Sequence, residues 1–399
     1  MVAVGFVAAL HIWKLPAALP LIQNSLGFSL LTAGVLLGIV QLAGMIGGLA
    51  VSLLAEVFGA RRTLILGLLF LSAGSVAGAL ATEAGLLLAS RAVEGLGFIV
   101  ASVVGPGLIR SHTSAQGINL ALGLWSAHQG TATLLGLVAS TLLLQVTSWQ
   151  VLWWTMAGVT LIPIPLVLRF VPADHRTGTN SATVAVKRIG VTAKSGWVWI
   201  SGMVFGCYTI QWMAVVGFLP TVYAGIGLTG VVPGVVTGVV GGLNAVGAVL
   251  TGVLLHRGAS AKPLLLLSFG LMAATSTLTF VVDWSSVQGG MAWQGACVGL
   301  FSLSGAMVPS TMTRMAVDLA PEGGSAPAAM GLMQQIFNIG NFTGPMLVAW
   351  LAMTTGGWSS TWWMTATFST IGIALSLALL RKPNGFQLPP VQFESVRLR

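Results

Sequence analysis

The distribution of basic residues constrains the fold more than any other feature, because fifteen of the seventeen Lys and Arg residues fall in alternate gaps between long apolar segments. The other gaps contain Glu83 and Asp283 and no basic residue. This asymmetry is the positive-inside pattern of multi-spanning membrane proteins, whose basic loops stay in the cytoplasm. The pattern therefore predicts a protein of the cytoplasmic membrane with both termini in the cytoplasm. The fifteen residues are Arg61, Arg62, Arg110, Arg169, Arg176, Lys187, Arg188, Lys194, Arg257, Lys262, Arg314, Arg381, Lys382, Arg397 and Arg399.

The composition excludes a soluble domain, since only 6% of the 399 residues are charged and 55% are hydrophobic. An apolar helix needs about 20 residues to cross a bilayer. The net charge of +9 is spread over short loops, so we read it as membrane topology and expect no nucleic-acid partner. We predict an all-α membrane protein with twelve transmembrane helices. They are expected over 2–22, 29–55, 63–81, 85–109, 119–145, 150–171, 197–223, 231–255, 263–282, 288–313, 327–353 and 360–381.

One long gap divides these helices into six and six. Residues 172–196 are rich in Thr, Ser and basic residues, and both halves carry a basic loop between their second and third helices. This correspondence predicts a duplicated unit, the arrangement of two bundles that rock about a central site. We expect a first bundle over 1–171, a cytoplasmic linker over 172–196, a second bundle over 197–381 and a cytoplasmic tail over 382–399. The first segment lacks a basic leader and a cleavage site, so we expect it to be a retained helix.

Glycine recurs at every fourth position in several helices, which gives a smooth face for close helix packing. Two interpretations stay open, namely tight static packing and a sliding seam between the two halves. The stripes are Gly230, Gly234, Gly238 and Gly242 in the eighth span, Gly44 and Gly48 in the second, and Gly340 and Gly344 in the eleventh.

Two basic residues, Lys14 and Arg91, lie inside apolar segments. At about 1.5 Å per residue, both sit roughly 10 Å below the outer surface of the apolar layer. A charge at this depth costs a few kcal/mol unless it faces protein or water. Glu94 follows Arg91 at i+3, on the same helical face, so a structural ion pair is one interpretation of the two residues.

Other polar side chains fall at similar depth on six helices. Each alone is typical of a hydrogen bond between helices, but together they favour a water-filled central site. We expect this site to bind a small-molecule solute through residues of both halves. The candidates for solute binding are Lys14, Arg91, Tyr208, Gln211, Trp212, Asn244, Gln334, Asn338 and Asn341.

The charges of this expected site favour a small anion, because Lys14 and Arg91 against Glu94 leave one excess positive charge. The nearby aromatic residues suit a flat organic ligand instead. Glu94, His128 and His11 are the candidates to carry a coupled proton. No phosphate-binding loop, metal-ligand cluster or nucleophile motif is present in the sequence, so we expect no enzyme activity, cofactor or metal.

Three segments resemble the major facilitator superfamily. Residues 55–62, Ala-Glu-Val-Phe-Gly-Ala-Arg-Arg, resemble the family's loop of an acid, a Gly three positions later, and then basic residues. Arg91, followed by Gly95 and Gly97, resembles its second motif, and residues 252–262 resemble a degenerate copy of the loop. In the first loop, Val57 and Ala60 replace positions that are usually basic. The resemblance implies alternating access, commonly proton-coupled. It also implies a conformational latch made of Glu56, Gly59, Arg61 and Arg62.

A narrower resemblance is to the cyanate and nitroimidazole permease branch, carried by residues 122–127 and 208–223. The first helix differs from that branch, since Trp13-Lys14-Leu15-Pro16 lacks the usual Asn. The sequence predicts a secondary transporter that acts as a monomer, moves a small anionic organic solute across the bilayer, and couples to a proton or another ion. An exporter of hydrophobic drugs or metabolites is the first alternative. A membrane sensor that binds a solute without transporting it is a more distant one.

Overall fold

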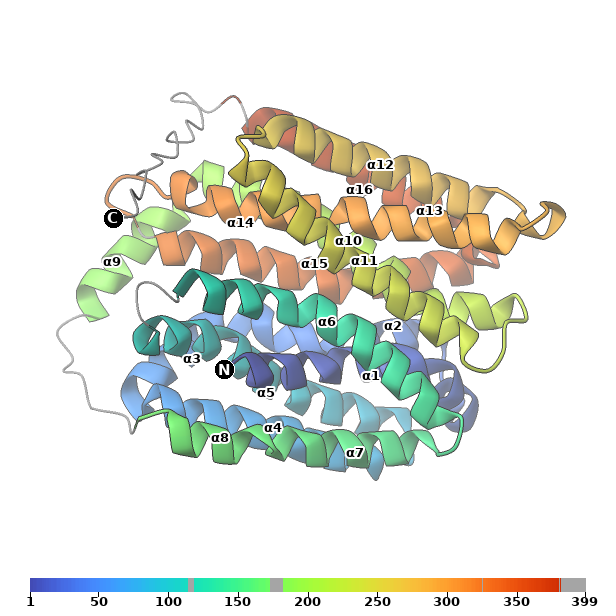
Figure 1. Cartoon of the computed structure of the whole chain (residues 1–399), viewed down its shortest axis with the longest axis horizontal. Coiled ribbons are helices and arrows are strands. Elements are labelled where there is room, and N and C mark those ends of the chain that lie inside the picture. The colour runs from blue at the N-terminus through green and yellow to red at the C-terminus, as the bar shows by residue number, and fades with distance from the viewer. Residues whose placement is uncertain (114–117, 173–181, 325, 380, 382–399) are drawn as a thin grey trace, which may run out of the picture.

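The computed structural model describes residues 1–113, 118–172, 182–324, 326–379 and 381, and these residues form helices joined by turns (Figure 1). The first half contains α1 Val2–Leu26, α2 Leu30–Gly38, η1 Ile39–Gln41, α3 Leu42–Phe58, α4 Ala60–Ala79, α5 Ala84–His112, α6 Ile118–Leu144, α7 Trp149–Leu161 and α8 Pro163–Phe170. The remainder contains α9 Ala182–Ala193, α10 Gly196–Gly225, α11 Val232–His256, α12 Ala261–Val281, η3 Trp284–Ser286, α13 Gly290–Gly305, α14 Met307–Leu319, α15 Ala326–Thr355, η4 Trp358–Ser360 and α16 Thr361–Leu379.

The predicted spans are confirmed within a few residues at their ends. Eleven helical segments of the described chain are long and apolar enough to cross a membrane, and the 27-residue helix α6 lies where the remaining span was expected. Short interruptions divide three spans into two pieces each, as at η1 between α2 and α3. Part of the expected linker, Ala182–Ala193, forms a helix. Lys187 and Arg188 lie in the middle of this helix, α9, which contacts α15.

The helices form two bundles of six membrane spans, one containing α1–α8 and the other α10–α16 (Figure 1). Three kinds of contact join the bundles. Helix α1 meets α10, α2 and α3 meet α15, and α6 meets α11. In the second and third contacts, the second span of one half meets the fifth span of the other half. This reciprocal pairing is expected for two halves related by a pseudo-two-fold axis.

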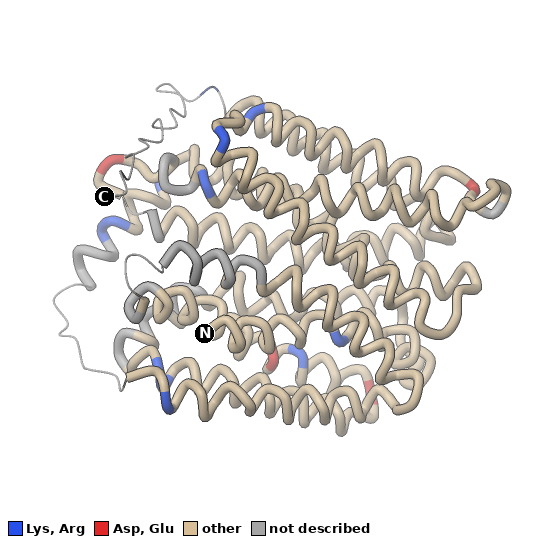
Figure 2. The backbone as a smooth tube through the Cα atoms, viewed as in Figure 1, with Lys and Arg blue, Asp and Glu red and all other residues tan. Residues whose placement is uncertain are grey.

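Most of the described Lys and Arg residues lie at one end of the molecule, here called the basic end (Figure 2). The turn between α3 and α4 lies there and depends on Gly59, whose φ of 95° suits glycine. Arg61 follows this turn, and one of its Nη atoms donates to the Leu168 carbonyl of α8 at 2.6 Å. Of the expected latch, Gly59, Arg61 and Arg62 are therefore placed at a turn of the basic end, while the side chain of Glu56 lies outside the described residues.

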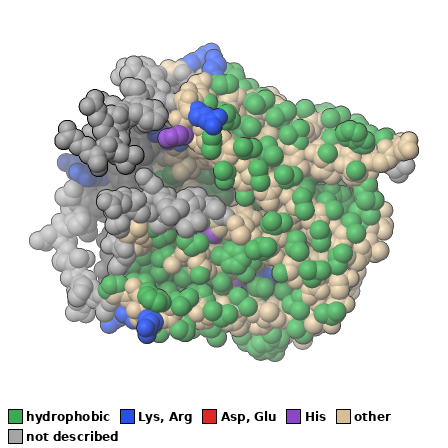
Figure 3. Space-filling view, in the orientation of Figure 1, with side chains coloured by type: hydrophobic (Ala, Val, Ile, Leu, Met, Phe, Trp, Pro, Cys, Tyr) green, Lys and Arg blue, Asp and Glu red, His purple; other side chains and the backbone are tan. Residues whose placement is uncertain are grey.

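Hydrophobic side chains are spread over the described part of the face seen in Figure 3. Large apolar residues such as Phe70, Val249 and Trp363 point outward and are exposed. A soluble protein rarely exposes apolar area on this scale, whereas a lipid-facing surface requires it. The outer surface therefore fits a hydrocarbon environment.

The glycine stripes lie both between the two halves and within one half. A Cβ on Gly234 of α11 would lie 1.7 Å from Thr141 Oγ1 of α6, so this stripe brings the two halves into contact. A Cβ on Gly344 of α15 would lie 2.2 Å from the Ile210 carbonyl of α10, within one half. The first is a seam between bundles and the second is packing inside a bundle.

The seam lies toward the end opposite the basic end. Gly34 and Gly38 of α2 touch the α15 backbone there, since Cβ atoms on them would lie 2.7 and 2.5 Å from the Pro345 and Phe342 carbonyl oxygens. The close glycine contacts between the halves therefore reach the end that lacks basic residues.

A pair of substitutions on α11 tests the packing within the second bundle. A Cβ on Gly247 would lie 2.0 Å from the Leu303 carbonyl oxygen of α13, so Gly247→Ala must displace a helix backbone. Gly252→Ala meets no described atom and gains up to about 1 kcal/mol of helix propensity. We expect Gly247→Ala to lower the melting temperature of the purified protein and Gly252→Ala to leave it unchanged or raise it. Equal melting temperatures for the two variants would contradict this packing.

Candidate functional site

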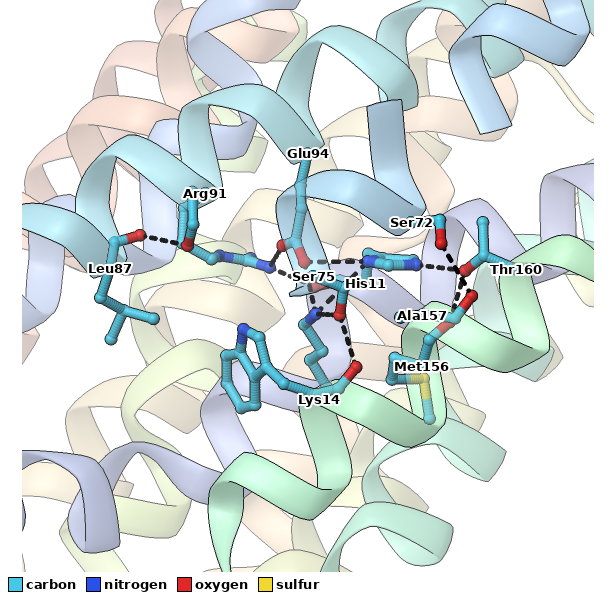
Figure 4. Close-up of polar contacts among 12 residues, drawn as sticks. His11, Lys14, Ser72, Ser75, Leu87, Arg91, Glu94, Met156, Ala157 and Thr160 are labelled. Atoms are coloured by element: carbon cyan, nitrogen blue, oxygen red, sulfur yellow. Dashed lines mark hydrogen bonds and ion pairs between the residues drawn. The ribbon is translucent and has the colours of Figure 1, made fainter. Parts of the chain in front are cut away.

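Four charged or ionisable side chains meet between α1 and α5 in the first bundle (Figure 4). His11 and Lys14 lie one turn apart on α1, and Arg91 and Glu94 lie one turn apart on α5. All four side chains are completely buried. We call these four residues the charged cluster.

Glu94 is the centre of the charged cluster. Lys14 Nζ donates to Glu94 Oε1 at 2.5 Å, and Arg91 Nη1 donates to Glu94 Oε2. His11 Nδ1 lies 3.2 Å from the same Oε1 atom that Lys14 contacts. One carboxylate therefore faces two cations and one imidazole.

A second layer of contacts from α4 and α7 fixes Lys14. Lys14 Nζ donates to Ser75 Oγ at 2.8 Å, and Ser75 Oγ donates to the Trp153 carbonyl at 2.7 Å. The ammonium also lies 4.5 Å from the centre of the Trp153 ring, within the range of a cation–π interaction. Gly74 lets α4 pack closely against Glu94 of α5, because a Cβ on Gly74 would lie 2.8 Å from Glu94 Cγ.

The backbone and a threonine position the remaining members. Arg91 Nη1 donates to the His11 carbonyl at 2.6 Å. His11 Nε2 lies 2.7 Å from Thr160 Oγ1, and Thr160 Oγ1 donates to the Met156 carbonyl at 2.6 Å. Helices α1, α4, α5 and α7 are thus tied together around the cluster.

The charged cluster is unbalanced. With His11 neutral, Lys14 and Arg91 exceed Glu94 by one positive charge, and none of these groups reaches solvent. Arg91 Nε and Nη2 are buried without a hydrogen-bond partner. Uncompensated buried charge is costly, by several kcal/mol per ion even after relaxation. An arrangement of this kind is typical of a functional site within a membrane.

A second group of residues lies where the two bundles meet. Trp13 of α1 contacts Trp212 of α10 edge to face, with ring centroids 5.4 Å apart. Trp212 Nε1 donates to Ser302 Oγ at 3.0 Å, and the Tyr208 ring lies 6.3 Å from that of Trp212. Asn244 Nδ2 donates to the Tyr208 hydroxyl oxygen at 3.1 Å. We call Trp13, Tyr208, Trp212, Asn244 and Ser302 the aromatic–amide group.

The other expected site residues lie apart from both groups. Gln211 donates to its own helix at the Cys207 carbonyl, 2.6 Å away, and accepts from Ser369 at 2.9 Å inside the second bundle. Asn338 is buried against Gly44 of α3, across the halves. Asn341 of the same helix is also buried, whereas Gln334 is exposed.

His128 of α6 contributes to a different contact. Its ring lies 4.6 Å from that of Trp125, and its Nδ1 contacts the Trp125 carbonyl. Trp125 fits against Gly105 of α5, where a Cβ would lie 2.3 Å from the ring. The described contacts of His128 do not include Glu94, whereas His11 Nδ1 lies 3.2 Å from Glu94 Oε1.

Lys14 and Arg91 were expected to share one chamber with residues of both halves. In this structure both are buried and form ion pairs with Glu94 of the first bundle. Trp13, adjacent to Lys14, faces Trp212 of the second bundle instead. The sequence analysis identified the polar stripe on α15. It did not identify Ser75, Trp153 and Thr160, which complete the charged cluster.

Among the described residues, no three His, Cys, Asp or Glu side chains are grouped closely enough to hold a metal ion. The site therefore consists of ion pairs, aromatic rings and amides.

Comparisons with known proteins place this architecture. The profile of the Major Facilitator Superfamily matches residues 1–326 and 260–397. The cyanate transport protein CynX of Escherichia coli is 28% identical over 216 residues, which cover 52% of this chain and 53% of that protein. The puromycin resistance protein pur8 of Streptomyces alboniger is 28% identical over 201 residues, covering 45% of this chain and 38% of that protein. The matched segments thus span about half or less of these relatives.

The fold itself is similar to that of solved transporters. A bacterial homologue of the human lysosomal transporter Spinster, in an inward-facing and unoccupied conformation, superimposes with a TM-score of 0.78 at 12% identity and covers 95% of this chain and 94% of that one. Since the family profile covers nearly the whole sequence and the two-bundle fold agrees with it, the chain belongs to the major facilitator superfamily.

Proposed function

We propose that this protein is a secondary transporter of the cytoplasmic membrane that moves a small anionic organic solute by alternating access. The observation that carries the proposal is the contact of Trp13 with Trp212 across the halves, beside a buried charged cluster with excess positive charge. The solute binds between the bundles, against the aromatic–amide group. Movement of one bundle against the other exposes it to either side in turn.

The chemistry of the aromatic–amide group supports a flat solute with hydrogen-bond acceptors. Trp13 is 3% exposed, and its Nε1 donor has no hydrogen-bond partner among the described residues. A buried donor without a partner costs free energy until a ligand or water accepts from it. The excess positive charge of the charged cluster, one residue away along α1, favours an anion over a cation at this position. Gln334, Asn338 and Asn341 of α15 are proposed to orient the solute when the halves move.

The direction of opening follows from the seam and the basic end. Basic loops of membrane proteins stay on the cytoplasmic side, so the closely packed end faces outward and the basic end faces the cytoplasm. The structure then corresponds to a carrier closed on the outside. The latch at Gly59, Arg61 and Arg62 lies at the cytoplasmic end, where the halves open and close.

The second candidate is an exporter of hydrophobic compounds. The rings of Trp13, Tyr208 and Trp212 suit an aromatic drug as well as a flat anion. Similarity to a puromycin resistance protein favours this candidate, whereas similarity to a cyanate transport protein favours an anion. The charge of the ligand separates the two candidates.

A thermal-stability screen of the purified protein tests the proposed ligand class. The panel contains cyanate, benzoate, acetate and nitrate as anions, and puromycin and other cationic drugs. A ligand present at 100 times its Kd stabilises the folded protein by about 2.7 kcal/mol. We expect at least one anion to raise the melting temperature and the cationic drugs to have no effect. Stabilisation by puromycin alone would support the exporter and contradict the anion carrier.

The Trp13→Phe variant tests the donor at the seam. The ring is kept but Nε1 is lost, so we expect the anion that stabilises the wild type to bind about five- to tenfold more weakly, the effect of one hydrogen bond of about 1 kcal/mol. The matched control is Trp363→Phe, since Trp363 is 60% exposed on the outer surface. Unchanged anion binding in Trp13→Phe would remove Trp13 from the site.

The Arg91→Ala variant tests whether the charged cluster takes part in transport. Glu94 keeps Lys14 as its partner in this variant, so the cluster becomes neutral and the protein is expected to fold. We expect uptake of labelled benzoate or cyanate into proteoliposomes to be abolished. The melting temperature is measured in parallel to confirm folding. Normal uptake by a folded Arg91→Ala protein would contradict the role of the cluster.

A reversible cross-link tests alternating access. The Cβ atom of Leu137 on α6 lies 3.5 Å from the Cβ position of Gly238 on α11, within the range of about 3.5–4.5 Å that a disulfide needs. In a background in which Cys207 and Cys297 are replaced by Ala, Leu137→Cys with Gly238→Cys is expected to cross-link the halves on oxidation. Uptake should then stop and return on reduction. Each single cysteine variant is the control, and uptake by the fully cross-linked protein would exclude movement at this seam.

A further inference from the structure

The hydrogen-bond inventory of the charged cluster determines which nitrogen of His11 carries a proton. Thr160 has one hydroxyl hydrogen, and it is donated to the Met156 carbonyl at 2.6 Å. Thr160 Oγ1 therefore accepts from His11 Nε2, 2.7 Å away. His11 Nε2 carries a hydrogen, and only Nδ1 is free to change its protonation.

Nδ1 of His11 lies between a donor and an acceptor. Lys14 Nζ is 3.4 Å from it, and Glu94 Oε1 is 3.2 Å from it. Without a hydrogen, Nδ1 accepts from the Lys14 ammonium. With a hydrogen, Nδ1 donates to Glu94. Both protonation states of His11 thus find a partner without any movement of the ring.

Lys14 uses all three of its N–H groups in the charged form. Ser75 Oγ accepts the first, because its own hydrogen goes to the Trp153 carbonyl. Glu94 Oε1 accepts the second and His11 Nδ1 the third. When Lys14 gives up one proton, its bonds to Ser75 and Glu94 remain and the bond to His11 is the one that changes.

The other charged groups hold their protonation states. A guanidinium such as that of Arg91 is not deprotonated in proteins. Glu94 faces two cations within hydrogen-bond distance, and opposite charges at this range favour the ionised carboxylate. The elements packed against Lys14 contribute Glu94 and Arg91 from α5, His11 from α1 itself, and the neutral Ser75, Trp153 and Thr160 from α4 and α7.

We propose that Lys14 carries the exchangeable proton of this transporter, with His11 Nδ1 as the acceptor through which the proton leaves, and that Glu94 is a permanent counter-charge. The charged cluster then has a formal charge of +1 with the proton and 0 without it. This assignment differs from the expectation that Glu94 carries the proton. The Lys–His contact, the full use of Lys14 donors and the shared carboxylate are the observations behind it.

If Lys14 carries the proton, proton and solute transport are coupled, and this step rests on the proposed function. Protonated Lys14 supplies the positive charge that favours an anion beside Trp13, and its deprotonation removes that charge. One proton and one monovalent anion are therefore bound in the same state and carried together. Because the proton and the anion carry opposite unit charges, their joint transport moves no net charge.

The proton position is tested without any solute. The full-length protein is labelled with [13Cε]lysine, which gives five resonances, and Lys14 is identified as the one missing in Lys14→Arg. We expect this resonance to shift between about pH 6 and about pH 9. The other four lysine resonances in the same spectrum serve as the internal reference. Should Lys14→Arg fail to fold, replacing Lys187, Lys194, Lys262 and Lys382 by Arg leaves Lys14 as the single resonance.

Labelling the glutamate carboxylates tests the alternative that Glu94 carries the proton. In the [13Cδ]glutamate spectrum, the resonance missing in Glu94→Gln is expected to stay constant from about pH 6 to about pH 9, since a carboxylate with two cations stays ionised. A shift of the Glu94 resonance with a constant Lys14 resonance would return the proton to Glu94. Constant resonances for both would show that the charged cluster exchanges no proton, and either result overturns the proposal.

Benzoate binding tests the coupling separately. Benzoate stays ionised at both pH 6 and pH 9, so any change in its affinity reports on the protein. We expect binding about tenfold weaker at pH 9 in the wild type, and equal binding at both pH values in Lys14→Arg, which keeps its charge. Equal binding in the wild type would contradict the coupling. Absence of benzoate binding at either pH would count against the proposed ligand class, while the lysine titration stands by itself.

Discussion

The attraction of Lys14 and Arg91 to one carboxylate organises the first bundle. Glu94 draws two cations from two helices into a space without solvent, and Ser75 and Thr160 supply the polar atoms that water would otherwise supply. Removing charged groups from water costs several kcal/mol per ion, so the helices around them must hold good geometry for the pairs to persist. The charged cluster is thus a requirement that the packing of α1, α4, α5 and α7 has to meet.

The second bundle has no counterpart of this cluster at the corresponding place among its described residues. Gln211 of α10 pairs with Ser369 of α16, and Ser276 of α12 pairs with Thr365 of α16, so neutral hydrogen bonds do the work of ion pairs there. The two bundles share an architecture but differ in electrostatics. Proton chemistry is therefore expected in one half and neutral recognition in the other, with the aromatic–amide group between them.

The sequence was sufficient for the fold because its signals are local. Each apolar run is long enough for a span, and the basic residues mark alternate loops. Lys14, Arg91 and Glu94 were identified for the same reason, since a charge in an apolar run stands out. The partners Ser75, Trp153 and Thr160 did not stand out, because an ordinary serine, tryptophan or threonine in a membrane helix carries no mark of what it faces. The similar depth of the polar residues suggested one shared chamber, but it did not reveal that Lys14 and Arg91 would both pair with Glu94 in a fully buried position.

Trp13 and Lys14 are neighbours on α1, and successive side chains of a helix point about 100° apart. One of them touches the second bundle through Trp212, and the other is fixed in the first bundle by Glu94. Helix α1 therefore contacts the second bundle on one side and the charged cluster on another. A rotation of α1 that separates Trp13 from Trp212 also moves Lys14 relative to the Glu94 carboxylate. Opening or closing of the contact between the bundles is therefore coupled to the buried ion pairs through two adjacent residues.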